Sequence, residues 1–78
     1  MKIKCVVSCR NAGGEPDFFP AIVELTQEQY DEGEHYEKAD DEAAGAGYDT
    51  GYLVYDENDG PSWLFAHFAW NKVKAVKI

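Results

Sequence analysis

The segment TQEQYDEGEHYEKADDEAAGAG (residues 26–47) decides how this chain folds. Thr26 is a typical helix N-cap, and Gln29, three residues later, completes a capping box. The glycine-rich sequence 45–47 ends the helical pattern. Gly33 is less favourable than alanine in mid-helix by about 1 kcal/mol, which predicts close packing or a kink at this point. We therefore expect one helix here, lying close against a sheet.

Drawn as a single helix at 100° per residue, the segment separates into two faces. The inward face holds small and aromatic residues, namely Tyr30, Gly33, Tyr36, Ala43 and Ala44. The outward face holds the charged residues and the histidine, namely Asp31, Glu34, His35, Lys38, Asp41 and Glu42. Asp40 departs from this division, because it projects toward the inward face.

The residues before the helix predict an antiparallel hairpin. Residues 1–9 alternate, with every odd-numbered side chain on one face, as in a half-buried strand. The sequence NAGGEPD (11–17) is rich in turn-forming residues. Residues 18–25 resume as a second strand, which we expect to start after Pro20, where the missing N–H does least harm.

The residues after the helix predict up to three further strands. GYLVYD (51–56) is apolar on both faces and is followed by a turn at 57–60. SWLFAHFAW (62–70) fits a buried strand, and also a short buried helix that begins after Pro61. We favour the strand. NKVKAVKI (71–78) alternates again and predicts a closing strand.

The predicted element order is β-β-α-β-β-β. This order describes one α+β domain over residues 1–78, in which a single helix packs across an antiparallel sheet of four to five strands. The expected core consists of Ile3, Cys5, Val7, Val23, Tyr36, Ala43, Leu53 and Phe65.

Charge is unevenly distributed along the chain. The net charge is −8, and residues 11–71 hold all fifteen Asp and Glu residues with one base, Lys38. Phosphates would be repelled by this acidic body, so we expect no direct contact with nucleic acid. A basic protein surface is the natural complement.

The termini and the cysteines indicate where the protein resides. No long apolar run predicts a membrane span, and the N-terminal sequence lacks the pattern of a signal peptide. Cys5 and Cys9 lie about 13 Å apart along one strand, too far for a disulfide. We expect both to be buried, reduced thiols in a cytoplasmic protein. If the gene belongs to a phage, the compartment is the cytoplasm of the host.

Three motifs that could support chemistry are better explained as structure. DENDG (56–60) has its glycine at the wrong position for a calcium loop and predicts a turn. Gly13 and Gly14 are followed by acidic residues, unlike a phosphate-binding loop. His67 could combine with Ser62 or a cysteine, but any short chain offers such sets, and no zinc-ligand spacing is present. We expect a non-enzymatic protein without a metal or another cofactor.

The acidic helix is the remaining candidate site. Eight carboxylates between Glu28 and Glu42 span about 21 Å, or one per roughly 2.6 Å. A DNA strand carries one phosphate per about 3.4 Å, so this helix could occupy a groove built for nucleic acid. The alternative is that the run is only a solvated face. The predicted partner-binding residues are Glu28, Asp31, Glu34, Glu37, Asp41 and Glu42.

Two segments carry a resemblance to known proteins. The segments TQEQYDEGEHYEKADDEAAGAGY (26–48) and YDENDGPSW (55–63) resemble small proteins of phages and other mobile elements. In size and charge the chain also resembles DNA-mimicking inhibitors such as some anti-CRISPR proteins. The resemblance implies an inhibitor that binds a basic groove of a host nucleic-acid-handling complex through acidic residues.

A second function fits the same composition. Eleven aromatic residues could form an oligomerisation surface of a structural or assembly accessory protein of a phage or mobile element. The acidic face would then serve only solubility. The sequence leaves the oligomeric state open.

Overall fold

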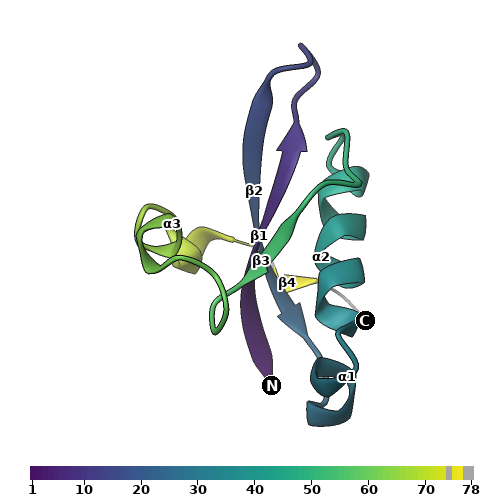
Figure 1. Ribbon diagram of the computed structural model, residues 1–78, viewed down its shortest axis with the longest axis vertical. Helices are drawn as coiled ribbons and strands as arrows, with labels where there is room; N and C mark the ends of the chain where they lie inside the picture. Colours follow the sequence, from purple (N-terminus) through teal and green to yellow (C-terminus); the bar gives the residue numbers. More distant parts are fainter. Residues whose placement is uncertain (74, 77–78) are drawn as a thin grey trace.

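The computed structural model describes residues 1–73, 75 and 76, with side chains described as far as residue 73. It is an α+β fold in which helices lie on both faces of a small sheet (Figure 1). The elements, in chain order, are β1 (Lys2–Arg10), β2 (Pro16–Glu24), α1 (Gln27–Asp31), α2 (Glu34–Gly45), β3 (Val54–Asp56), α3 (Ser62–Ala66), the 3₁₀ helix η1 (Trp70–Lys72) and β4 (Ala75–Val76).

The sheet is built around the β1–β2 hairpin, as the alternating pattern predicted. Its strand order is β3-β1-β2-β4, in which β3, β1 and β2 are antiparallel. β4 pairs in parallel with β2 at Ile22 and Val23. The expectation that β2 starts after Pro20 is wrong, because pairing continues to Arg10 opposite Pro16.

Two prolines are tolerated in β2 because they face its outer edge. The even-numbered residues of β1 hydrogen-bond toward β3, so the even-numbered residues of β2 face away from β1. On that edge Pro16 and Pro20 have no N–H, and the N–H of Phe18 donates to Oδ1 of Asp17 at 2.8 Å. β4 covers the edge at Ile22. Strand addition between Pro16 and Pro20 is therefore disfavoured.

The main core lies between the sheet and α2. It consists of Ile3, Cys5, Val7 and Cys9 from β1, Ala21 and Val23 from β2, Leu25, and Ala39 and Ala43 from α2. Five of the eight predicted core residues are confirmed as buried: Ile3, Cys5, Val7, Val23 and Ala43. Tyr36 and Leu53 are instead 36% and 57% exposed, and Phe65 is half-buried on the other face of the sheet.

The prediction of a single helix over residues 26–45 is wrong, because Gly33 divides it. Gly33 adopts φ 78°, a left-handed conformation that glycine reaches without strain. The predicted capping box at the start of α1 is confirmed, with Thr26 and Gln29 bonded reciprocally at 2.9 and 3.2 Å. Since α2 restarts after the kink, its buried stripe is His35, Ala39 and Ala43. His35 therefore points inward, contrary to the single-helix wheel.

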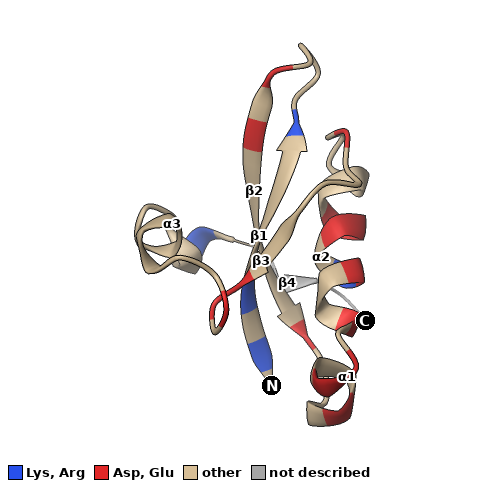
Figure 2. Cartoon of the chain, viewed as in Figure 1, with Lys and Arg blue, Asp and Glu red and all other residues tan. Residues whose placement is uncertain are grey.

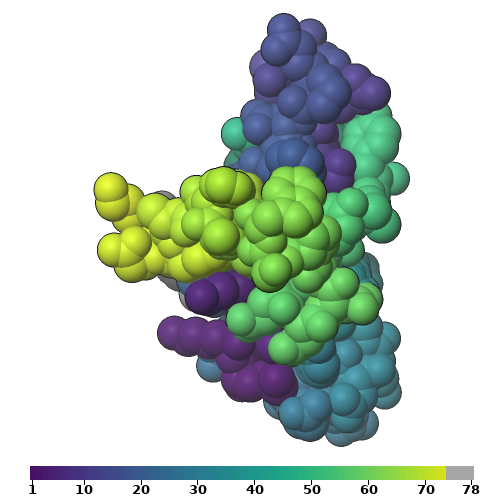
Figure 3. Space-filling model, turned by 60° about the vertical axis from the view of Figure 1, so that its left-hand side comes forward, coloured from purple at the N-terminus to yellow at the C-terminus, as the bar shows by residue number. Residues whose placement is uncertain are grey.

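The prediction of a strand at 62–70 is also wrong. After Pro61 the chain forms α3, and it then runs through η1 across the face of the sheet opposite α2 (Figure 3). Leu64 is buried there, and Val6 of β1 is fully buried on the same face. This second layer explains why the third strand is apolar on both faces. Of the predicted closing strand at 71–78, the structure describes a 3₁₀ turn and β4, while residues 74, 77 and 78 lie outside the described part.

The thiols have the properties that the strand pattern predicted. Both cysteines are free and buried. Burial, and then the neighbouring charges of Asp56 and Glu57, raise the pKa of Cys5 from 9.0 to about 12. Because the folded-state pKa is the higher one, the neutral thiol stabilises the fold fully below pH 9, and this contribution is lost as pH rises toward 12.

We therefore predict an alkaline loss of stability that depends on Cys5. The free energy of unfolding should fall by about 1.4 kcal/mol more between about pH 8 and about pH 10 than it would without this thiol. Chemical denaturation at both pH values, for the native chain and for Cys5→Ala, measures the difference. An equally steep fall in Cys5→Ala would contradict the prediction, as would rapid reaction of the native thiols with a thiol reagent at neutral pH.

Candidate functional site

The six predicted partner-binding residues lie on the two helices that follow β2. Glu28, Asp31, Glu37 and Asp41 are exposed, whereas Glu34 and Glu42 are half-buried. Acidic residues run along the outer side of α1 and α2, away from the sheet (Figure 2). Glu32, exposed at the C-cap of α1, extends this surface and was missed, because the unbroken wheel took no account of the kink at Gly33.

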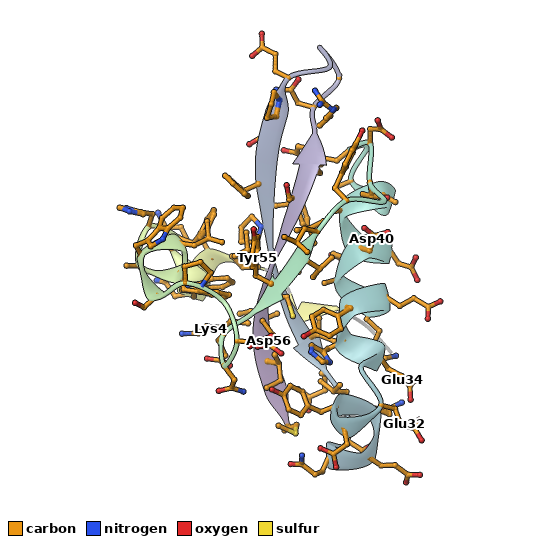
Figure 4. All side chains as sticks on the ribbon, in the orientation of Figure 1. Lys4, Glu32, Glu34, Asp40, Tyr55 and Asp56 are labelled. Atoms are coloured by element: carbon orange, nitrogen blue, oxygen red, sulfur yellow. The ribbon has the colours of Figure 1, made fainter. Side chains whose placement is uncertain are left out.

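Three carboxylates share the outer face of α2. Glu34, Glu37 and Asp41 are spaced by three and four residues on α2, opposite its buried stripe, so they project together. Glu32 and Glu34 both point away from the sheet (Figure 4). Glu42 is turned toward the edge of the helix, where it lines a hollow of about 560 Å³ beside Lys72. We name Glu28, Asp31, Glu32, Glu34, Glu37 and Asp41 the acidic helix face.

No side chain among residues 1–73 forms an ion pair with these carboxylates. Among residues 1–73 the only ion pair within 4.0 Å joins His35 to Asp56, which lies outside the acidic helix face. Lys38 is the one base of α2, and it is half-buried. Glu37 and Asp41 are four residues apart and repel by about 0.2–0.5 kcal/mol. Asp41 and Glu42 also lie near the C-terminal end of α2, where the helix dipole disfavours anions.

Beside this face lies a buried polar cluster centred on Asp56. Its carboxylate accepts five hydrogen bonds, three of them from side chains on α1 and α2. Oδ1 accepts from the backbone N–H groups of Asn58 and Asp59 at 2.9 and 2.7 Å. Oδ2 lies 2.9 Å from Nε2 of His35 and 3.4 Å from the hydroxyl groups of Tyr30 and Tyr36. Asp56 therefore joins both helices to the turn after β3, which lies across from them in Figure 4.

His35 is enclosed within this cluster. Its ring lies between Tyr30 and Tyr36, with centroids 4.6 and 4.0 Å away. Because a carboxylate can only accept, Nε2 of His35 carries the hydrogen of its bond to Asp56. In the described part of the chain Nδ1 has no hydrogen-bond partner. Burial, and then the charges of Asp56 and Asp59, raise the pKa of Tyr36 above 10, so its hydroxyl stays a donor at neutral pH.

The cluster was not predicted from the sequence. DENDG does form the expected turn, which the carboxylate of Asp56 fixes. The same carboxylate also bonds to His35, whose side chain the helical wheel placed outward. The signal that could have found the cluster is Gly33, which resets the helical phase by breaking the helix. His35 and Asp56 are each only 3% exposed, and the carboxylate of Asp56 is occupied by donors of the protein itself.

The other candidate chemical groups are not brought together. Ser62 on α3 and His67 at its C-cap are exposed, whereas Cys5 and Cys9 lie under α2 on the opposite face of the sheet. Within the described residues no group of three or more His, Cys, Asp or Glu side chains is arranged to hold a metal ion. None of the described helices is long and apolar enough to cross a membrane.

Comparisons with protein-family models, with curated proteins and with solved structures found no match to this chain. Its function is therefore inferred from its own residues and their geometry.

Proposed function

We propose that this protein is a non-enzymatic inhibitor that uses the acidic helix face to bind a basic groove on a nucleic-acid-handling protein or complex. The observation that carries the proposal is the acidic helix face, whose carboxylates are exposed except for the half-buried Glu34 and form no ion pair with residues 1–73. Such a face contributes repulsion to the folded protein, and a basic partner would relieve it.

The spacing of the carboxylates supports a groove that ordinarily holds a nucleic-acid backbone. Along α2 the outward carboxylates of Glu34, Glu37 and Asp41 follow one another by about 4.5 and about 6 Å. Phosphates follow one another by about 3.4 Å along one DNA strand, so Lys and Arg side chains that track a backbone could also reach these carboxylates. The groups on α1 continue the line beyond the kink at Gly33. Direct binding of nucleic acid is disfavoured by the same charges.

Charge reversal on α2 tests this proposal. The variant Glu37→Lys/Asp41→Lys should weaken binding to a captured partner by roughly tenfold or more, since two attractive contacts of up to about 1 kcal/mol each become repulsive. The fold should be unchanged, because both side chains are exposed and a lysine at position 41 suits the end of the helix. The measurement is affinity for the partner captured from host lysate, beside the melting temperature of each variant.

The matched control is Glu15→Lys/Glu57→Lys. It changes the net charge from −8 to −4, as the test variant does, because each Glu→Lys or Asp→Lys exchange adds two charges. Both control positions are exposed and lie outside the helices. The control should bind nearly as well as the native chain. Equal weakening of both variants would show a general charge effect, and unchanged binding of the test variant would refute the proposed face.

A second candidate function is self-association in an assembly. Tyr36, Tyr52 and Leu53 are exposed around a hollow of about 450 Å³, and Trp63 on α3 is 63% exposed. Exposed apolar groups of this kind occur at protein interfaces. Sedimentation at low and high salt separates the two candidates, since an aromatic dimer would persist in high salt while the acidic chain should stay monomeric at both.

A further inference from the structure

A third hollow lies between the kink at Gly33 and the turn after β3. Its volume is about 480 Å³. Tyr30, Asp31, Tyr36 and Asp59 line it, and the buried pair His35 and Asp56 forms its floor. The hollow therefore opens next to the acidic helix face, with which it shares Asp31.

The hollow offers many hydrogen-bond acceptors and few free donors. Three carboxylates contribute to it, and no Lys or Arg is among its lining residues. The carboxylate of Asp59 accepts no hydrogen bond from the described residues, and that of Asp31 accepts only from Gln27, at 2.9 Å. In the floor, the buried Nδ1 of His35 has no hydrogen-bond partner among the described residues. A ligand that fits these groups must supply hydrogens and positive charge.

The aromatic rings favour a flat ligand. Tyr30 stacks on one side of His35, and Tyr36 packs on it at a tilt of 36° and remains exposed. Its hydroxyl is only weakly engaged by Asp56 at 3.4 Å. A guanidinium group is planar, stacks on aromatic rings, and presents five N–H donors in a fixed fork. An ammonium group offers three donors and a point charge, and gains less from a flat aromatic wall.

We propose that this hollow binds a guanidinium group, and specifically an arginine side chain, with the carboxylates of Asp31 and Asp59 as acceptors and the ring of Tyr36 as its stacking surface. This inference rests on the proposed function in one respect: it identifies arginine as the partner residue that the acidic surface recognises most specifically. The hollow itself can be tested without any partner.

The test is an NMR titration of the isotope-labelled native chain with N-acetyl-arginine amide. The N-acetyl amides of lysine and glutamine serve as comparison probes, because they share the backbone of the arginine probe. The ionic strength is held constant. The arginine probe should shift the amide signals of Gly33, Tyr36, Asn58 and Asp59 and saturate in the millimolar range. The lysine probe should bind more weakly, and the glutamine probe should cause no shifts.

Two matched variants locate the binding. Asp31→Asn/Asp59→Asn should raise the dissociation constant of the arginine probe by roughly fivefold, the loss expected for exposed charged contacts. Glu15→Gln/Glu57→Gln makes the same change in net charge at two carboxylates that do not line the hollow, and a glutamine at position 57 can still accept the N–H of Lys4, so this variant should bind the probe like the native chain. Both variants should keep the native amide spectrum outside the substituted positions, because all four side chains are exposed.

The outcomes separate this inference from the proposed function. Saturable arginine binding at the hollow supports the inference even if no basic partner is captured. Absence of localised shifts, equal binding of the lysine probe, or equal weakening by both variants would overturn it. If capture of a partner depends on Glu37 and Asp41, that result would still support the proposed function after such a failure.

Discussion

Replacing Asp56 with alanine is expected to destabilise the protein by about 3–5 kcal/mol, because it leaves the donors of a buried cluster without their acceptor. The carboxylate accepts a hydrogen bond from Nε2 of His35 at 2.9 Å. It also accepts hydrogen bonds from two backbone N–H groups of the turn after β3. Its removal should lower the melting temperature by roughly 15–30 °C in a domain of this size. Thermal and chemical denaturation of the variant measure the change.

Two further variants give this prediction its controls. Asp59→Ala removes an exposed carboxylate three residues away and should change stability by less than about 0.5 kcal/mol. Asp56→Asn keeps an oxygen for the backbone N–H groups of the turn but places an amide N–H₂ near His35. Its melting temperature should therefore lie between those of the native chain and Asp56→Ala. A melting temperature of Asp56→Ala within a few degrees of the native value would contradict the role assigned to the cluster.

Replacing Gly60 with alanine is expected to destabilise the protein by about 2–3 kcal/mol through overpacking. A Cβ atom at this position would lie 2.5 Å from Cε2 of Phe65 and 2.8 Å from the backbone oxygen of Asp56. The ring of Phe65 could shift, but the backbone oxygen accepts the N–H of Gly60 itself at 2.7 Å and cannot easily move. The strain should appear as a lower denaturation midpoint and as changed amide signals in α3.

Gly45→Ala is the matched control for Gly60→Ala. Gly45 is the last residue of α2, and a Cβ there would meet nothing within 4 Å. Its φ is not positive, so alanine should stabilise the helix by up to about 1 kcal/mol. Equal stability of Gly60→Ala and the native chain would show that α3 packs less closely on the turn than the structure describes.

The sequence was sufficient for the hairpin and the start of the helical segment. Alternation over residues 1–9 predicted the buried face of β1, and Thr26 with Gln29 predicted the N-cap of α1, because both signals are local. Among the described residues, the closing strand predicted over 71–78 is present only as the two residues of β4, and the 3₁₀ helix η1 in its first part was not predicted. The parallel pairing of β4 with β2 joins segments far apart in the chain, and a local pattern does not specify it.

The two main errors have physical causes. Gly33 indicated either close packing or a kink, but the wheel was drawn unbroken through it, so the inward turn of His35 was missed. Residues 62–70 are apolar because α3 and η1 cover the second face of the sheet, and burial of this kind is equally compatible with a strand. The exposed positions of Glu28, Asp31, Glu37 and Asp41 were predicted correctly, since the acidic side chains had no buried partners available.

The most direct measurement of the proposed function is the affinity of the native chain for its purified partner, as a function of salt and of added duplex DNA. We expect binding to weaken steeply as the salt concentration rises. We also expect duplex DNA to displace the protein, because both would occupy the same basic groove of the partner. An affinity that is independent of salt, together with a ternary complex that holds both the protein and DNA, would contradict it.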